Sequence, residues 1–152
     1  MILFLDIDGV LNLPYKFRGK DKYGDIYEPN CIEAFKYLCD NLEFDIVISS
    51  TRKMDGLKFL QELWDYRNYP GNVIDITPNI VDMSDIEHYD LCDRGMEINQ
   101  WIKDNNYNGK YLIIDDIPDF SIEQEKYFYR TNQTTGLTLR DVDRILKMDF
   151  IK

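Results

Sequence analysis

The acidic sequence Asp6-Ile7-Asp8, which directly follows the apolar run 2–5, is the first candidate for chemistry in this 152-residue chain. In extended backbone, residues two apart point to the same side, so both carboxylates would share one face. An ionised Asp6 could attack an electrophile while Asp8 transfers a proton on the leaving group. Gly9 permits a tight turn that brings backbone N–H groups toward an anion. Acidic pairs are also common in solvated loops, so this pair needs further support.

Two more polar clusters stand where apolar runs end. They are Ser49-Ser50-Thr51-Arg52 after residues 45–48 and Asp115-Asp116 after residues 111–114. Ligands of open parallel sheets bind beyond the carboxyl ends of the strands, so adjacent strands would bring these groups together with the first acidic pair. Carboxylates that close repel one another unless a cation lies among them or a proton is shared. Oxygen ligands favour a hard cation, and Mg²⁺ is the usual one in phosphate chemistry.

Several side chains and one glycine are candidates for holding a phosphoryl group there. Ser49 can donate a hydrogen bond to a phosphoryl oxygen, and we prefer it to Ser50 because it directly follows the apolar run. Arg52 and Arg94 can neutralise charge on the transferring group. We expect Gly9, Ser50 and Arg52 to contact substrate. The alternative for Arg52 is a pair with a surface carboxylate, and the alternative for Arg94 is a charge at the start of a helix.

Taken in order, these residues resemble the four motifs of the haloacid dehalogenase (HAD) superfamily. The matching residues are Asp6-Ile7-Asp8-Gly9-Val10, Ser49, Arg94 and Asp115-Asp116. The chain is most similar to the small HAD domains of Swiss Army knife RNA-repair proteins and to the phosphatase half of phage polynucleotide kinase-phosphatase. Supporting stretches include Thr77-Pro78 and Gly136-Leu137-Thr138.

The resemblance implies a HAD-type Rossmann-like fold and a Mg²⁺-dependent phosphohydrolase. Asp6 would be the nucleophile that forms an aspartyl-phosphate, and Asp8 would act as general acid and then as general base. Ser49 would orient the phosphoryl group, and Arg94 would stand where the superfamily more often has lysine. The metal ligands would be Asp6, Asp8 through its backbone carbonyl, Asp115 and Asp116. Which of the last two binds the metal directly stays open.

The elements expected to position these residues alternate between strands and helices. Strands are predicted at 2–5, 45–48, 73–76 (an edge strand), 111–114 and 127–129, and helices from 29, from 57, around 97–102 and from 139. This order predicts an α/β three-layer sandwich with a central, mostly parallel sheet. We expect a single domain spanning 1–152, with 11–29 as a short excursion or flap and no large cap domain over the site. Residues 79–92 have no clear assignment.

The excursion interleaves aromatic with basic residues. They are Tyr15, Phe17, Tyr23 and Tyr27 with Lys16, Arg18, Lys20 and Lys22. Such a patch can stack and hold a base or a single strand, although packing of a small folded flap explains it nearly as well. With an open site, we expect the substrate to be a nucleotide or a polynucleotide 3′-phosphate end. The alternatives are a sugar or metabolite phosphatase, and a non-catalytic HAD-fold accessory or binding module.

Charge and composition limit the partners. The formal net charge of −10 argues against tight non-specific binding to DNA or RNA. His88 is the only histidine, which excludes a multi-histidine zinc site, and Cys31, Cys39 and Cys92 are expected to be free thiols. No apolar run is long enough for a targeting segment or a membrane span, so we expect a cytoplasmic protein without a membrane partner. The oligomeric state stays open.

Overall fold

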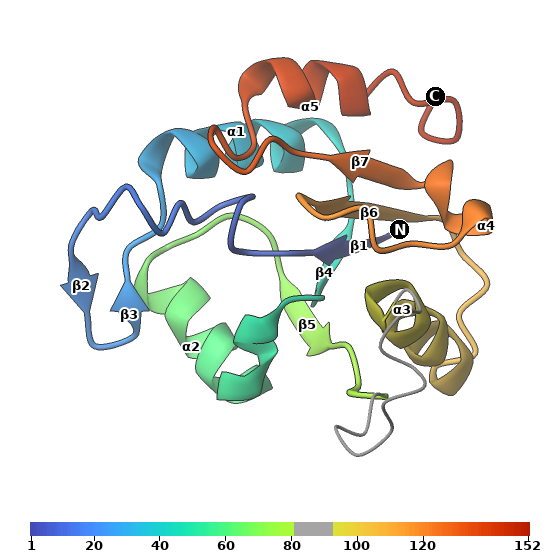
Figure 1. Ribbon diagram of the computed structural model, residues 1–152, viewed down its shortest axis with the longest axis horizontal. Coiled ribbons are helices and arrows are strands. Elements are labelled where there is room, and N and C mark those ends of the chain that lie inside the picture. The colour runs from blue at the N-terminus through green and yellow to red at the C-terminus, as the bar shows by residue number, and fades with distance from the viewer. Residues whose placement is uncertain (81–92) are drawn as a thin grey trace.

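A five-stranded parallel sheet lies at the centre of the computed structural model, which describes residues 1–80 and 93–152 (Figure 1). In the order β5-β4-β1-β6-β7, the strands are Val73–Ile76, Asp45–Ile48, Ile2–Leu5, Tyr111–Asp115 and Phe128–Arg130. Each neighbouring pair is parallel. The predicted α/β class, the parallel sheet and the edge position of β5 are confirmed. The fifth strand begins and ends one residue later than predicted.

Helices cover both faces of the sheet and make three layers. They are α1 (Pro29–Asn41), α2 (Leu57–Tyr66), α3 (Asp93–Asp104), α4 (Ile122–Glu125) and α5 (Leu139–Ile145), with a 3₁₀ helix at Thr51–Asp55. Leu3 and Leu5 of β1 pack into the core shared with α1, α2 and α5. Ile2 and Phe4 point to the other face, toward Trp101 of α3. Strand β1 is therefore buried on both faces, as its continuous apolar sequence predicted.

The excursion between β1 and α1 folds as a small hairpin, β2 (Lys20–Asp21) with β3 (Gly24–Asp25). Tyr27 is buried and packs beside Trp64 of α2, and Tyr23 lies partly buried on the same side of the core. Tyr15 and Phe17 are 59% and 67% exposed. Packing as a folded flap therefore accounts for half of the aromatic residues in the excursion, and the other half is left on the surface.

Two residues discussed above, His88 and Cys92, lie outside the described residues, as do most of 79–92. Cys31 is buried and Cys39 partly buried, both as free thiols. Burial raises the pKa of the Cys31 thiol to about 11, which keeps it protonated at neutral pH. Within 1–80 and 93–152, no helix combines the length and the apolar character that a membrane span requires.

Candidate active site

The registers of the three central strands bring the predicted catalytic residues to one level. The last residue of β1, Leu5, pairs with Ile48 of β4 on one side and with Ile114 of β6 on the other. The next residues along the chain, Asp6, Ser49 and Asp115, therefore lie side by side at the carboxyl edge of the sheet. This is the edge at which parallel sheets bind ligands.

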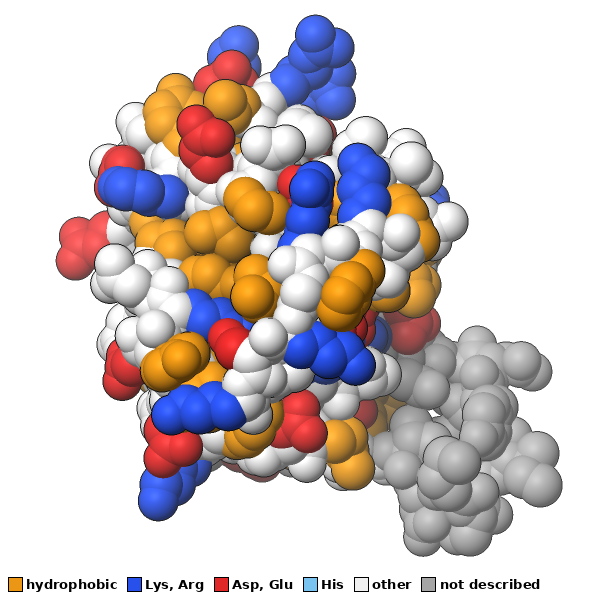
Figure 2. Space-filling view, turned by 90° about the vertical axis from the view of Figure 1, so that its left-hand side faces the viewer, with side chains coloured by type: hydrophobic (Ala, Val, Ile, Leu, Met, Phe, Trp, Pro, Cys, Tyr) orange, Lys and Arg blue, Asp and Glu red, His pale blue; other side chains and the backbone are white. Residues whose placement is uncertain are grey.

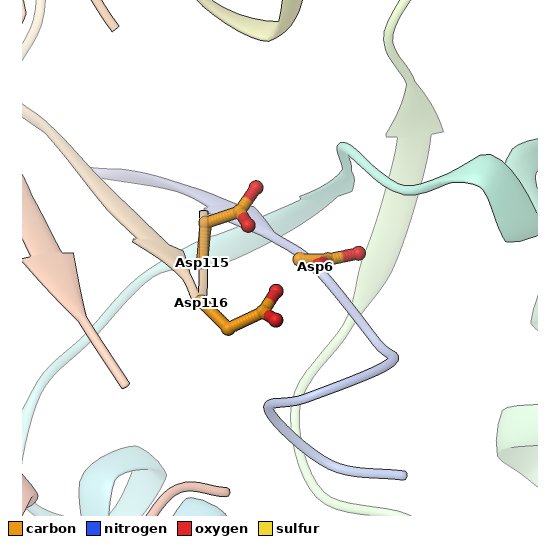
Figure 3. Close-up of side chains that lie close together, drawn as sticks. All are labelled: Asp6, Asp115 and Asp116. Carbon is orange, nitrogen blue, oxygen red and sulfur yellow. The ribbon is translucent and has the colours of Figure 1, made fainter. Parts of the chain in front are cut away.

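Three carboxylates converge at this edge. One oxygen each of Asp6, Asp115 and Asp116 lies within 4.8 Å of the others, and the three side chains project into the same region beyond the strand ends (Figure 3). Asp6 and Asp115 are almost fully buried. One guanidinium nitrogen of Arg94, Nη1, lies 2.7 Å from Asp115 Oδ2 and 3.2 Å from Asp6 Oδ1. Three acids facing one base leave a surplus of negative charge on oxygen ligands only, a donor set that fits Mg²⁺.

Burial is the main cause of the shifted pKa values of Asp6 and Asp115. Burial raises the pKa of Asp6, although the charge of Arg94 and a hydrogen bond from Ser50 act in the opposite direction. Burial, reinforced by the charge of Asp6, likewise raises the pKa of Asp115. A bound divalent cation favours the ionised form of both groups, because it supplies the positive charge that the cluster lacks.

Gly9 is required next to this cluster for steric reasons. Its φ of +80° lies in the left-handed region, and a Cβ there would lie 2.5 Å from Cγ of Asp116. Its own N–H donates to the carbonyl of Asn12 (2.8 Å). Gly9 therefore serves the site by letting the chain turn tightly against Asp116, while its N–H is engaged within the loop.

Asp8 lies outside the carboxylate cluster and is held by two side chains. Its Oδ1 accepts hydrogen bonds from Nδ2 of Asn12 (2.7 Å) and from Nη2 of Arg52 (3.0 Å), and its Oδ2 accepts one from Nε of Arg52 (2.9 Å). Both partners of the ion pair are about one-third exposed. Arg52 therefore pairs with a carboxylate, as the alternative interpretation of this residue predicted. Its partner, however, is the predicted acid–base residue rather than an unrelated surface group.

The two serines take different positions. The Ser50 hydroxyl accepts a hydrogen bond from the Arg52 N–H (3.2 Å) and is hydrogen-bonded to Asp6. The carbonyl of Ser49 accepts a hydrogen bond from Arg94 (2.8 Å), and its buried hydroxyl has no hydrogen-bond partner among the described residues. Ser50 thus already orients Asp6, whereas the Ser49 hydroxyl has its hydrogen-bonding capacity left for a ligand.

Lys53 and Glu97 form a buried ion pair that sequence reasoning missed. Lys53 is 7% exposed, and its Nζ lies 2.6 Å from Oε2 of Glu97 and 3.2 Å from both Oγ1 of Thr77 and the carbonyl of Pro78. The pair joins the 3₁₀ helix and the end of β5 to α3, the helix that carries Arg94. The sequence feature that could have indicated Lys53 is its position directly after the polar cluster that contains the two serines.

Arg130 also lies at the site without having been predicted. It ends β7, pairs in register with Asp115, and donates from Nε to the carbonyl of Asp116 (3.0 Å). The next residue, Thr131, donates from Oγ1 to the carbonyl of Gly9 (2.9 Å). Polar residues directly after a predicted strand were expected at the carboxyl edge of the sheet. The same rule applies to Arg130 and Thr131, which follow the aromatic strand predicted at 127–129.

A pocket of about 370 Å³ lies over the carboxylate cluster. It is lined by Asp6, Asp8, Arg94 and Asp116, and by Tyr15 from the excursion. The Tyr15 hydroxyl donates to the carbonyls of Gln133 (2.8 Å) and Thr134, which fixes its ring at the rim. The pocket thus combines an acidic floor with an aromatic wall.

Comparison with known families identifies the family of the chain. No curated protein and no solved structure matches the chain. A family model described as the HAD domain in Swiss Army Knife RNA repair proteins matches residues 2–142. The match spans all five strands of the sheet and includes Asp6, Asp115 and Asp116. It confirms the resemblance seen in the motifs. The chain belongs to this family of HAD domains.

Proposed function

We propose that this protein is a Mg²⁺-dependent phosphomonoesterase that forms an aspartyl-phosphate on Asp6. Membership in a HAD family from RNA repair proteins suggests a phosphatase-type function. The observation that carries the proposal is the convergence of Asp6, Asp115 and Asp116 around Arg94 at the carboxyl edge of the sheet. A cation stabilises a cluster with excess negative charge, and phosphoryl transfer can use both that cation and the arginine.

Asp6 is held in place for nucleophilic attack. Its Oδ1 accepts a hydrogen bond from the Ile7 N–H (2.8 Å) and faces Arg94, so the carboxylate has one orientation. In the first step, a bond forms between an Asp6 oxygen and phosphorus while the bond to the ester oxygen breaks. The leaving oxygen takes a proton from Asp8. In the second step, water attacks phosphorus while the bond between phosphorus and the Asp6 oxygen breaks, Asp8 takes the water proton, and inorganic phosphate leaves with the Asp6 carboxylate restored.

The Arg52–Asp8 pair has a role in this sequence. Asp8 accepts hydrogen bonds from Arg52 at both oxygens, as a carboxylate does. The acid role needs a proton on Asp8, so Arg52 has to leave it before the first step. The incoming phosphoryl group offers Arg52 another anionic partner, which would bring Arg52 onto the substrate as predicted.

Mg²⁺ would be held by Asp6, Asp115 and Asp116 with the backbone carbonyl of Asp8, and it would neutralise charge on the phosphoryl oxygens. Arg94, which lies beside Asp6 and Asp115, would neutralise further charge on the phosphoryl group. The Ser49 hydroxyl, which has no partner among the described residues, would donate to a phosphoryl oxygen.

The preferred substrate in this proposal is a nucleotide or a polynucleotide 3′-phosphate end. Tyr15 is 59% exposed at the rim, where its ring can stack on a base. The carboxyl end of strand β1, beyond which the site lies, points toward the left of Figure 1. Figure 2 views the molecule from that side. Basic, acidic and hydrophobic side chains are interspersed there, so local contacts rather than a broad basic surface would hold the chain end.

The test is phosphate release from a 3′-phosphorylated oligonucleotide in the presence of Mg²⁺. We expect Asp6→Asn to lower kcat by about 1,000-fold or more and EDTA to abolish activity, because the nucleophile and the cation act as a unit. Asp65→Asn makes the same chemical change at an exposed position of α2 and should leave the rate unchanged.

Three results would contradict parts of the proposal. An undiminished rate in Asp6→Asn would show that Asp6 is not the nucleophile. Equal or faster turnover of sugar phosphates would exclude the preference for nucleic-acid ends. Absence of turnover across a broad panel of phosphate esters with Mg²⁺ would favour a non-catalytic binding module.

A further inference from the structure

A second pocket, of about 510 Å³, adjoins the one over the carboxylate cluster. The two share Asp116, Ile117 and Gln133 as lining residues. The second pocket lies within the size range of small-molecule sites. Because the pockets are contiguous, a substrate that reacts at Asp6 can extend into the second pocket. The phosphoryl-transfer steps above leave this pocket without a role.

Arg130 supplies the positive charge of the second pocket. Its Nε is bound to the carbonyl of Asp116, and the β6–β7 register fixes its backbone opposite Asp115. Other arginines of the chain are neutralised by carboxylates, namely Arg18, Arg52, Arg67 and Arg94. Within the described part of the chain, Arg130 forms no such ion pair. Its terminal nitrogens are therefore available to an anion immediately beside the candidate metal site.

The wall that carries Arg130 is hydrogen-bonded to the loop that follows β1. Thr131 donates to the carbonyl of Gly9 (2.9 Å), and the N–H of Leu137 donates to the carbonyl of Val10 (2.8 Å). Tyr15 binds the same wall from the excursion, through the carbonyl of Gln133. A cation held on a fixed wall loses little conformational freedom when it binds a ligand, which favours affinity.

We propose that the second pocket binds the phosphate one nucleotide away from the scissile 3′-phosphate, with Arg130 as the specificity-determining residue. The planar guanidinium binds phosphate oxygens in a bidentate manner. Ile117 and Pro118 line the same pocket and offer apolar surface to the intervening nucleoside. One local cation can recognise a second phosphate, so the proposed site does not require a broad basic surface. The inference rests on the proposed phosphatase function, whose active site supplies the first phosphate position.

The sharpest test compares a nucleoside 3′-monophosphate with the corresponding 3′,5′-bisphosphate, since the two differ only in the second phosphate. We expect wild-type protein to release the 3′-phosphate of the bisphosphate with about tenfold higher kcat/KM, as one charge-assisted contact permits, mainly through a lower KM. Arg130→Gln should remove most of that difference, and Arg130→Lys should retain part of it. Arg140→Gln, at an exposed position of α5, is the matched control and should retain all of it.

Two kinetic outcomes would overturn the inference. One is equal kcat/KM for the two substrates in the wild-type protein. The other is an equal loss on both substrates in Arg130→Gln, which would mean that Arg130 acts on Asp116 rather than on a second phosphate.

Failure of the proposed function is distinguished by a binding experiment that needs no turnover. The probe is a nucleoside 5′-monophosphate with a free 3′-hydroxyl, titrated into the protein and followed by calorimetry or NMR. Arg130→Gln should weaken its binding about tenfold relative to wild type and to Arg140→Gln. Absence of phosphate release from every ester would overturn the phosphatase, whereas equal binding by wild type and Arg130→Gln would overturn the second phosphate site.

Discussion

Among the arginines that pair with aspartates, Arg67 and Arg94 differ in the balance of charge around them. Arg67 binds Asp21 one to one, with Nε and Nη2 each 2.9 Å from a different carboxylate oxygen. Arg94 faces both Asp6 and Asp115, at 3.2 Å and 2.7 Å, in a cluster that also contains a third acid. The first site joins the excursion to the end of α2. The second lies at the carboxyl edge of the sheet.

The acids of the two sites shift in opposite directions. The hydrogen bond from Arg67 lowers the pKa of Asp21. Burial raises the pKa of Asp6 and of Asp115 despite the nearby Arg94. A matched pair stabilises the fold in which it lies, whereas an unmatched buried cluster opposes folding until a cation joins it. Asp21 and Arg67 are thus structural, and the cluster around Arg94 has the character of a functional site.

Among the changes that test this comparison, Asp115→Asn has the largest expected effect. Loss of a candidate metal ligand should lower Mg²⁺-dependent kcat/KM by about 100-fold or more, since replacing a residue that only hydrogen-bonds to a metal ligand costs up to about that much. The same change replaces a buried acid, whose ionised form is disfavoured by burial and by the charge of Asp6, with a neutral amide. Without Mg²⁺ the melting temperature should therefore stay the same or rise by about 2–4 °C, which corresponds to about 1 kcal/mol. Phosphate release and thermal unfolding without metal measure the two effects. A lower melting temperature with normal activity would mean that Asp115 has a structural role rather than a role in metal binding.

The same chemical change at the other site should have the reverse signature. Asp21→Asn leaves Arg67, which is 5% exposed, without its counter-charge. We expect the free energy of unfolding to fall by about 2 kcal/mol, because a charge-assisted pair is lost and a mostly buried cation remains. Activity per folded molecule should be unchanged. Denaturant titration and the kinetic assay check the two parts, and a stability equal to wild type would show that the pair contributes nothing.

Most of the fold could be predicted because local pattern and final environment agree. The runs 2–5, 46–48 and 112–114 are apolar throughout, and these residues are buried in the corresponding strands. Polar residues directly after such runs fall at one sheet edge. For that reason the convergence of Asp6 with Asp115 and Asp116 could be predicted from sequence order alone.

Side-chain partners could not be predicted in the same way. The pairing of Arg52 with Asp8, and of Lys53 with Glu97, depends on how the 3₁₀ helix at Thr51–Asp55 aims consecutive residues in different directions. Arg130 directly follows the strand predicted at 127–129, so the rule for polar residues after a strand would have placed it at the carboxyl edge of the sheet, whereas the structure makes it the last residue of β7. Differences of a few ångströms and one residue decide which charged groups meet, and hydrophobic pattern does not encode them.

The smallest expected effect is the pH dependence of the matched pair. The folded-state pKa of Asp21 lies below its unfolded value of about 3.9, so the stability that it contributes is fully present above that value. This contribution is lost as the pH falls through the lower, folded-state pKa. The difference in unfolding free energy between wild type and Asp21→Asn should therefore be constant from about pH 7 to 5 and should shrink below about pH 4. Denaturant titrations of both proteins across this range measure it. A difference that persists undiminished at pH 2 would show that the loss in Asp21→Asn comes from packing rather than from the charge on Asp21.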